Sequence, residues 1–104
     1  MQINADKVAE VIILARDMPR GAGQFDQFVS GLTPEEQASL VAIMWIGRDS
    51  FDAAEWDEAY QTAREEATTP TQDYLKGSPH LADHLENGLE ALGISAGSEE
   101  DELY

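Results

Sequence analysis

The sequence has no cysteine and few basic residues. Without cysteine, disulfides and thiolate metal sites are excluded, so the fold must be stabilised by packing alone. The absence of cysteine also fits a reducing compartment. Only 6 Lys and Arg residues stand against 21 Asp and Glu residues, which gives a formal net charge of −15.

The bases are also scattered along the chain. Nucleic acids and anionic membrane surfaces both require clustered Lys and Arg, so we expect neither among the partners. The acidic excess keeps a protein dispersed in solution, or it attracts a basic partner. The bases are Lys7, Arg16, Arg20, Arg48, Arg64 and Lys76.

Long hydrophobic runs are missing as well. The longest extends from Leu40 to Ile46, whereas a membrane-spanning helix needs about 20 apolar residues. The N-terminal stretch lacks the basic region and cleavage site of a secretory signal. We therefore expect a cytoplasmic protein. We also expect a single helical domain over residues 1–95 and a disordered acidic tail over residues 96–104.

The apolar spacing and the capping signals predict an all-α fold. We expect helices over residues 5–18, 33–47, 52–67 and 79–92, and a short helix from Pro70 to Lys76 capped by Thr69. Residues 19–32 are expected to form a connection with one short helical turn. The predicted architecture is a compact bundle of four main helices plus one or two short helical turns. Gly88, in the middle of the last helix, indicates a close helix crossing.

The helix over residues 33–47 has the clearest signals. Thr33, Pro34 and Glu36 form a capping box with proline at the first helical position. The apolar run that follows must be covered on every side. This helix is therefore the centre of the domain, or it lies partly in a homodimer interface. Met44 and Trp45 belong to the core in the first case and contact a partner in the second.

His80 and His84 form the sharpest candidate metal pair. If both stand on one helix four residues apart, their imidazoles can chelate Zn²⁺, Ni²⁺ or Cu²⁺. A metal site needs three or four ligands, and no H-E-x-x-H glutamate lies between them. The plainer interpretation is two surface histidines.

A second candidate site lies at the break between the helix that ends near residue 67 and the short helix after it. Arg64, Thr69, Asp73 and Tyr74, together with Glu65, could line a polar pocket for an anionic or peptide ligand. Arg64 has no acid three or four residues away, so its partner must lie outside its own helix. The alternative is a structural junction in which Arg64 bonds to a nearby acid or carbonyl.

No motif in the sequence indicates catalysis. Neighbouring acids such as Glu35 and Glu36 stand on faces predicted to be wet, whereas a general acid needs an apolar setting. The serines show no G-x-S-x-G elbow, and neither a Walker loop nor an EF-hand loop is present. We therefore predict a protein that is not an enzyme and uses no cofactor.

Three landmarks resemble a bacterial family, domain of unknown function 3775. They are the W-I-G-R end of the capped helix at 45–48, the E-W-D-E sequence at 55–58, and the Y-L-K-G-S-P-H-L turn at 74–81. The resemblance covers Leu32 to Ser95 and extends weakly to the first helix. It implies a small helical domain and no particular activity. The connection after the first helix is shorter here, and the family pattern does not require histidine at 80 and 84.

These observations favour a non-catalytic protein-interaction or regulatory module that binds an unidentified protein or a second copy of the chain. The alternative is a small metal- or ligand-binding accessory protein that uses His80, His84 and the Arg64–Tyr74 junction. A third hypothesis is an acidic decoy for a basic partner. The candidate interaction surface comprises Met44, Trp45, Arg48, Arg64, Thr69, Asp73 and Tyr74.

Overall fold

The computed structural model describes residues 3–18, 20–66 and 69–94, and every regular element in them is helical. The expected tail at 96–104 lies outside these residues. The helices in chain order are α1 (Ala5–Arg16), α2 (Ala22–Ser30), α3 (Pro34–Gly47), the 3-10 helix η1 (Ala53–Glu55), α4 (Trp56–Glu65), α5 (Thr71–Lys76) and α6 (Leu81–Ala91).

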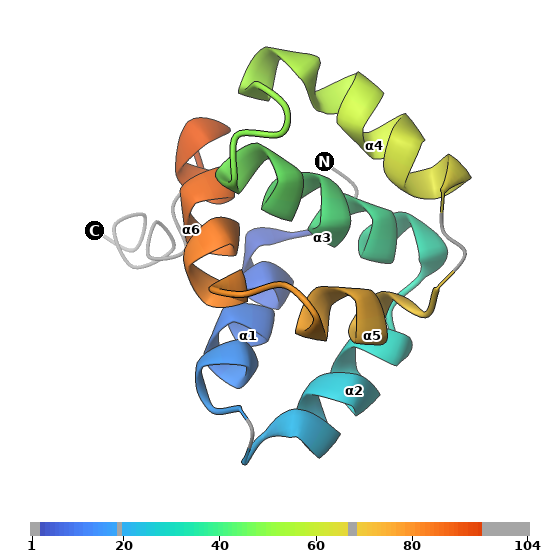
Figure 1. Ribbon diagram of the computed structural model, residues 1–104, viewed down its shortest axis with the longest axis vertical. Coiled ribbons are helices and arrows are strands. Elements are labelled where there is room, and N and C mark those ends of the chain that lie inside the picture. Colours follow the sequence, from blue (N-terminus) through green and yellow to red (C-terminus); the bar gives the residue numbers. More distant parts are fainter. Residues whose placement is uncertain (1–2, 19, 67–68, 95–104) are drawn as a thin grey trace.

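Helix α3 is the centre of the fold, as its sequence predicts. The Thr33 side chain accepts a hydrogen bond from the Glu36 backbone N–H, and the Glu36 carboxylate accepts one from the Thr33 backbone N–H. This capping box fixes the start of the helix, and every residue from Ala38 to Ile46 is buried. Helix α3 contacts α4, α5 and α6, and Figure 1 shows it in the middle of the molecule with α4 on one side and α1 and α2 on the other.

Helix α6 crosses α3 with its backbone almost in contact. A Cβ atom at Gly47 would lie 1.7 Å from the carbonyl oxygen of His84, and one at Gly88 would lie 2.1 Å from the carbonyl oxygen of Ile43. Only glycine fits at either position. The prediction that Gly88 permits a close crossing is therefore confirmed, and Gly47 is its counterpart on α3.

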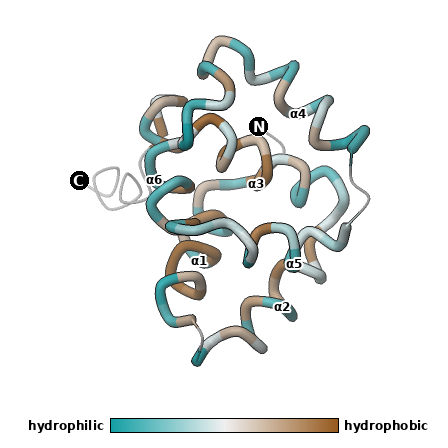
Figure 2. The backbone as a smooth tube through the Cα atoms, in the orientation of Figure 1, coloured by the Kyte–Doolittle hydropathy of each residue, from teal (hydrophilic) through white to brown (hydrophobic). Residues whose placement is uncertain are grey.

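Helix α4 rests on α3 through small side chains. Ala59 and Ala63 are its buried residues, while Trp56 and Tyr60 stack on each other and are only partly buried. Figure 2 shows mainly hydrophilic and near-neutral residues along α4, and strongly hydrophobic ones in α1. The outer face of α4 is therefore a polar surface of the molecule.

The bundle differs from the predicted one in its number of longer helices. Residues 22–30 form the full helix α2 instead of a single turn, so among the described residues five helices rather than four have nine or more residues. Phe25 and Val29 on α2 are fully buried. This burial stabilises a helix that the glycines in and around it make difficult to predict from the sequence.

Several helix ends also differ from prediction. Helix α1 ends at Arg16 rather than residue 18, and α4 ends at Glu65, with Ala67 outside the described residues. Pro70, not Thr69, stands at the N-cap of α5 and makes no side-chain cap bond. Helix α6 begins at Leu81, because His80 adopts a left-handed conformation with φ of 57°. Within the described ranges, no helix is long and apolar enough to cross a membrane.

Candidate functional site

A pocket opens where α3, α4 and α5 meet. Its volume is about 360 Å³, which lies within the range of ligand-binding cavities. We call it the α3–α4–α5 pocket. Helix α3 supplies Pro34, Gln37, Ala38, Val41 and Trp45; the α4 side supplies Ala63, Arg64 and Glu66; the α5 side supplies Thr69, Thr71 and Tyr74.

One wall of the pocket is held by a hydrogen bond between two aromatic side chains. The indole Nε1 of Trp45 donates to the hydroxyl of Tyr74 at 2.9 Å. The Trp45 ring also stacks on Phe51, with ring centroids 5.6 Å apart. Trp45 is thus only 9% exposed, whereas Tyr74 is 39% exposed. Together they form a largely apolar wall of the pocket, with the Tyr74 hydroxyl bonded to the Trp45 indole.

Gln37 holds the second wall by bonding to three segments at once. Its Nε2 donates to the carbonyl oxygens of Val29 and Leu32, each at 3.0 Å. Its Oε1 accepts from the Thr71 hydroxyl, also at 3.0 Å. The buried amide and hydroxyl are therefore satisfied, and they tie α5 to the start of α3. Both walls are preorganised by these contacts.

Arg64 lies at the charged edge of the pocket. Its Nη1 donates to the Tyr60 hydroxyl at 3.2 Å and lies 3.9 Å from Oε2 of Glu35 on α3. The guanidinium also lies 6.0 Å from the centre of the Tyr60 ring. The hydrogen bond to Tyr60 and, less strongly, the charge of Glu35 raise the pKa of Arg64. The prediction that Arg64 finds its partner outside its own helix holds for the ion pair with Glu35, whereas its hydrogen bond goes to Tyr60 within α4.

The pocket brings together part of the predicted interaction surface. Trp45, Arg64, Thr69 and Tyr74 line it. Asp73 is exposed on α5, and its carboxylate oxygen Oδ1 lies 3.9 Å from the Nζ atom of Lys76.

Two other predicted surface residues lie elsewhere. Met44 is fully buried in the core, so it cannot contact a partner from this position. Arg48 is exposed at the end of α3 and donates to the Ser50 hydroxyl at 3.1 Å. Neither residue lines the α3–α4–α5 pocket.

The predicted histidine pair lacks the helical geometry that motivated it. His80 precedes α6 in a left-handed conformation, and only His84 stands within the helix. The four-residue spacing therefore does not place both imidazoles on one helical face. Among the described residues, no group of three or more His, Cys, Asp or Glu side chains could hold a metal ion.

Several lining residues were not singled out from the sequence. In the sequence Pro34 indicates only a helix start, and Val41 belongs to the apolar run that must be covered on every side; nothing in the sequence points to Ala38. Gln37 gave the one available signal, because an amide directly before an apolar run must find partners once it is buried. This signal predicts that the Gln37 amide forms hydrogen bonds, but it does not predict which segments supply the partners.

The described residues form a small helical protein with a pocket between α3, α4 and α5. The chain belongs to the family described as "Protein of unknown function (DUF3775)", whose model matches residues 22–94. The match includes every helix that lines the pocket and confirms the resemblance of the sequence landmarks. No curated protein and no solved structure matches the chain.

Proposed function

We propose that this chain is a non-catalytic protein-interaction module that takes one apolar side chain of its partner into the α3–α4–α5 pocket. The observation that carries the proposal is a cavity of about 360 Å³ with Val41, Ala38 and the Trp45 ring among its lining. Such a cavity rewards burial of an apolar group, by about 1.5–3 kcal/mol for one large side chain. The Tyr74 hydroxyl adds a site for a hydrogen bond to the partner backbone.

A homodimer through α3 is not part of this proposal. The sequence argument for it was an apolar helix that needs cover on every side. In this fold the rest of the same chain supplies that cover, since every residue from Ala38 to Ile46 is buried. A partner therefore binds at the junction of the three helices and not along α3.

The alternative, a small-molecule-binding accessory protein, uses the same pocket. Arg64 favours it, because a guanidinium can hold a carboxylate or phosphate group. The metal part of that alternative has no support from the positions of His80 and His84. The two functions are separated by the kind of molecule that enters the pocket.

Two tryptophan indoles provide a direct test. Trp45 lines the pocket and Trp56 does not, so their indole N–H resonances in ¹⁵N-labelled protein serve as probe and internal control. The test ligands are octapeptides of Gly and Ser with one central Leu, Phe or Trp. We expect at least one of them to shift the Trp45 resonance with a Kd near 1 mM, about 4 kcal/mol of binding free energy, and to leave Trp56 unchanged.

Two variants complete the test. Val41→Phe fills the pocket and is expected to abolish the shift, while Ile13→Ser changes an exposed residue that does not line the pocket and should bind normally. If no peptide moves the Trp45 resonance up to about 5 mM, the interaction-module proposal is wrong. Binding of small carboxylates or phosphates without any peptide binding would favour the alternative.

A further inference from the structure

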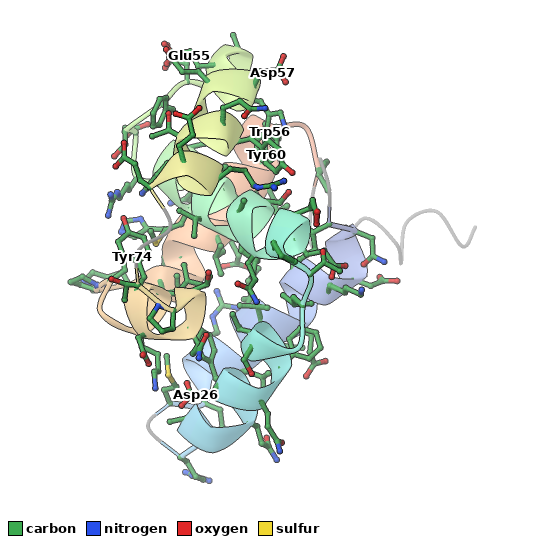
Figure 3. The ribbon with its side chains drawn as sticks, turned by 90° about the vertical axis from the view of Figure 1, so that its right-hand side faces the viewer. Asp26, Glu55, Trp56, Asp57, Tyr60 and Tyr74 are labelled. Atoms are coloured by element: carbon green, nitrogen blue, oxygen red, sulfur yellow. The ribbon has the colours of Figure 1, made fainter. Side chains whose placement is uncertain are left out.

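The charges around the pocket are mainly negative. Glu66 lines it, and Glu35 lies within 3.9 Å of Arg64 at its edge. Glu65 on α4 and Asp73 on α5 are also exposed, and both helices contribute residues to the pocket lining. Figure 3 shows Tyr74 on α5, well separated from Trp56 and Tyr60 on α4. The pocket extends toward that aromatic pair at Arg64, which lines it and donates to the Tyr60 hydroxyl. Among the described residues at the pocket itself, the two carboxylates of Glu66 and Glu35 stand against the single base Arg64.

The bases near the pocket are already engaged. Lys76 lies 2.7 Å from one carboxylate oxygen of Asp26 and 2.9 Å from the other. Arg64 directs its Nη1 to the Tyr60 hydroxyl and to Glu35. A carboxylate ligand would have to draw Arg64 from these contacts while lying close to Glu66. The field of the whole chain, with its net charge of −15, opposes such a ligand as well.

We infer that the partner segment is basic: an apolar side chain enters the α3–α4–α5 pocket, and flanking Lys or Arg residues pair with the carboxylates around it. This inference rests on the proposed function and specifies its partner class. Arg64 then weakens binding, because its positive charge repels the flanking cations and its ion pair with Glu35 competes with them for that carboxylate. The acidic surface attracts the segment and speeds association, with a strong dependence on salt.

The sharpest test compares three octapeptides with the same central Phe and flanks of Lys, Ser or Glu. We expect affinity to fall in that order when the shift of the Trp45 resonance is titrated at low salt. Raising the ionic strength to 0.15 M should reduce the advantage of the Lys peptide, since exposed charges are then screened over about 8 Å. The Ser peptide should respond little to salt.

Charge-removing variants give predictions of opposite sign. Arg64→Gln should strengthen binding of the Lys peptide about two- to fivefold, and Glu66→Gln should weaken it by a similar factor. The matched control is Asp57→Asn. Like Glu66→Gln it removes one negative charge, but at a residue of α4 that does not line the pocket. It should leave the affinity unchanged at 0.15 M salt. Circular dichroism of each variant checks that the helices are intact.

The outcomes distinguish the two proposals. If the Ser and Lys peptides bind equally well, the basic-partner inference is wrong while the interaction module stands. If the Glu peptide binds best and Arg64→Gln abolishes its binding, the pocket recognises an anion and the inference is overturned. If none of the three peptides binds, the proposed function itself fails.

Discussion

Helix α3 packs against its neighbours in two different ways. Toward α6 it presents Gly47, and the two backbones approach so closely that a single added methyl group would overlap a carbonyl oxygen. Toward α4 it meets Ala59 and Ala63, and a cavity of about 360 Å³ remains beside Ala63. An apolar helix with cover on all sides therefore need not be packed uniformly. Glycine at the crossing point closes one side, whereas the small alanine side chain leaves space on the other side, between α4 and α5.

The largest expected effect is at the α3–α6 crossing. Gly88→Ala would place a Cβ atom 2.1 Å from a backbone oxygen of Ile43, so no side-chain adjustment can relieve the overlap. We expect a loss of about 3 kcal/mol or more in the free energy of unfolding, at the upper end for overpacking. Urea unfolding followed by circular dichroism measures it. Truncation of the Ile43 side chain should not restore stability.

Gly23 on α2 is the matched control for this substitution. A Cβ atom there would meet nothing within 4 Å, so Gly23→Ala should stabilise the protein by up to about 1 kcal/mol. If Gly88→Ala instead proved as stable as the unmodified chain, the two helices would not cross as closely as described.

The next effect concerns the hydrogen bond that holds the pocket wall. Tyr74→Phe leaves the Trp45 indole N–H without its acceptor, and we expect a loss of about 1–2 kcal/mol in unfolding free energy. A double-mutant cycle with Trp45→Phe should give a coupling energy of about 1 kcal/mol. Tyr60→Phe removes an acceptor from the exposed Arg64 and should cost much less, because solvent screens an exposed contact. Equal losses for the two tyrosines would mean that the wall is not fixed by this bond.

The cavity itself predicts a smaller effect. Val41→Phe adds volume toward the α3–α4–α5 pocket, so we expect unfolding free energy to change by less than about 1 kcal/mol. Leu40→Phe adds volume to the neighbouring residue, which is fully buried, and should cost about 1–3 kcal/mol. Thermal unfolding of both variants makes the comparison. Similar losses at the two positions would indicate that the pocket is not open space.

The smallest effect lies at the first turn of α3, beside the Pro34 edge of the pocket. The Lys7 ammonium lies 2.6 Å from Oε2 of Glu36, and this contact, followed by the Thr33 backbone N–H, lowers the pKa of Glu36. A lowered pKa means that the unfolded chain binds the proton more readily. The stabilisation is therefore present above the ordinary pKa of a glutamate and is lost as pH falls through the lowered value.

Unfolding measured from pH 7 down to pH 3 tests this dependence. Glu36→Gln should be less stable than the unmodified chain at pH 7 by about 0.5 kcal/mol, and the difference should shrink as pH falls. A constant difference across the range would mean that the Glu36 carboxylate adds nothing through its charge.

The sequence predicts α3 well because local and tertiary signals agree there. Thr33, Pro34 and Glu36 mark its start, and its apolar run requires the central position that it takes. Helix α2 was predicted as a single turn because Gly21, Gly23 and Gly31 weaken its intrinsic propensity, and tertiary burial of Phe25 overrides that weakness. The start of α6 was misplaced because the Ser78-Pro79 pair resembles a cap, whereas the chain reverses at His80.

The candidate site was predictable only in part. Arg64, Thr69 and Tyr74 were expected at one junction because a helix breaks between them, and all three line the pocket. The sequence predicts Trp45 in the core or at a partner surface. In the structure Trp45 is almost fully buried and also lines one wall of the pocket. The opposite wall depends on where α5 returns to the start of α3. That return is set by long-range contacts such as the one between Thr71 and Gln37, for which a single sequence carries no signal.

The small area that α4 buries has a consequence for motion. Ala59 and Ala63 are the buried residues of α4, and Trp56 and Tyr60 pack against the core only partly buried. Helix α4 therefore loses less apolar contact on local opening than α3 would, so its amide protons should exchange with solvent before those of α3. Each such opening would remove one side of the α3–α4–α5 pocket. In the proposed interaction, the largest side chain that the pocket admits is then set by the free energy of that opening as well as by the volume of the closed state.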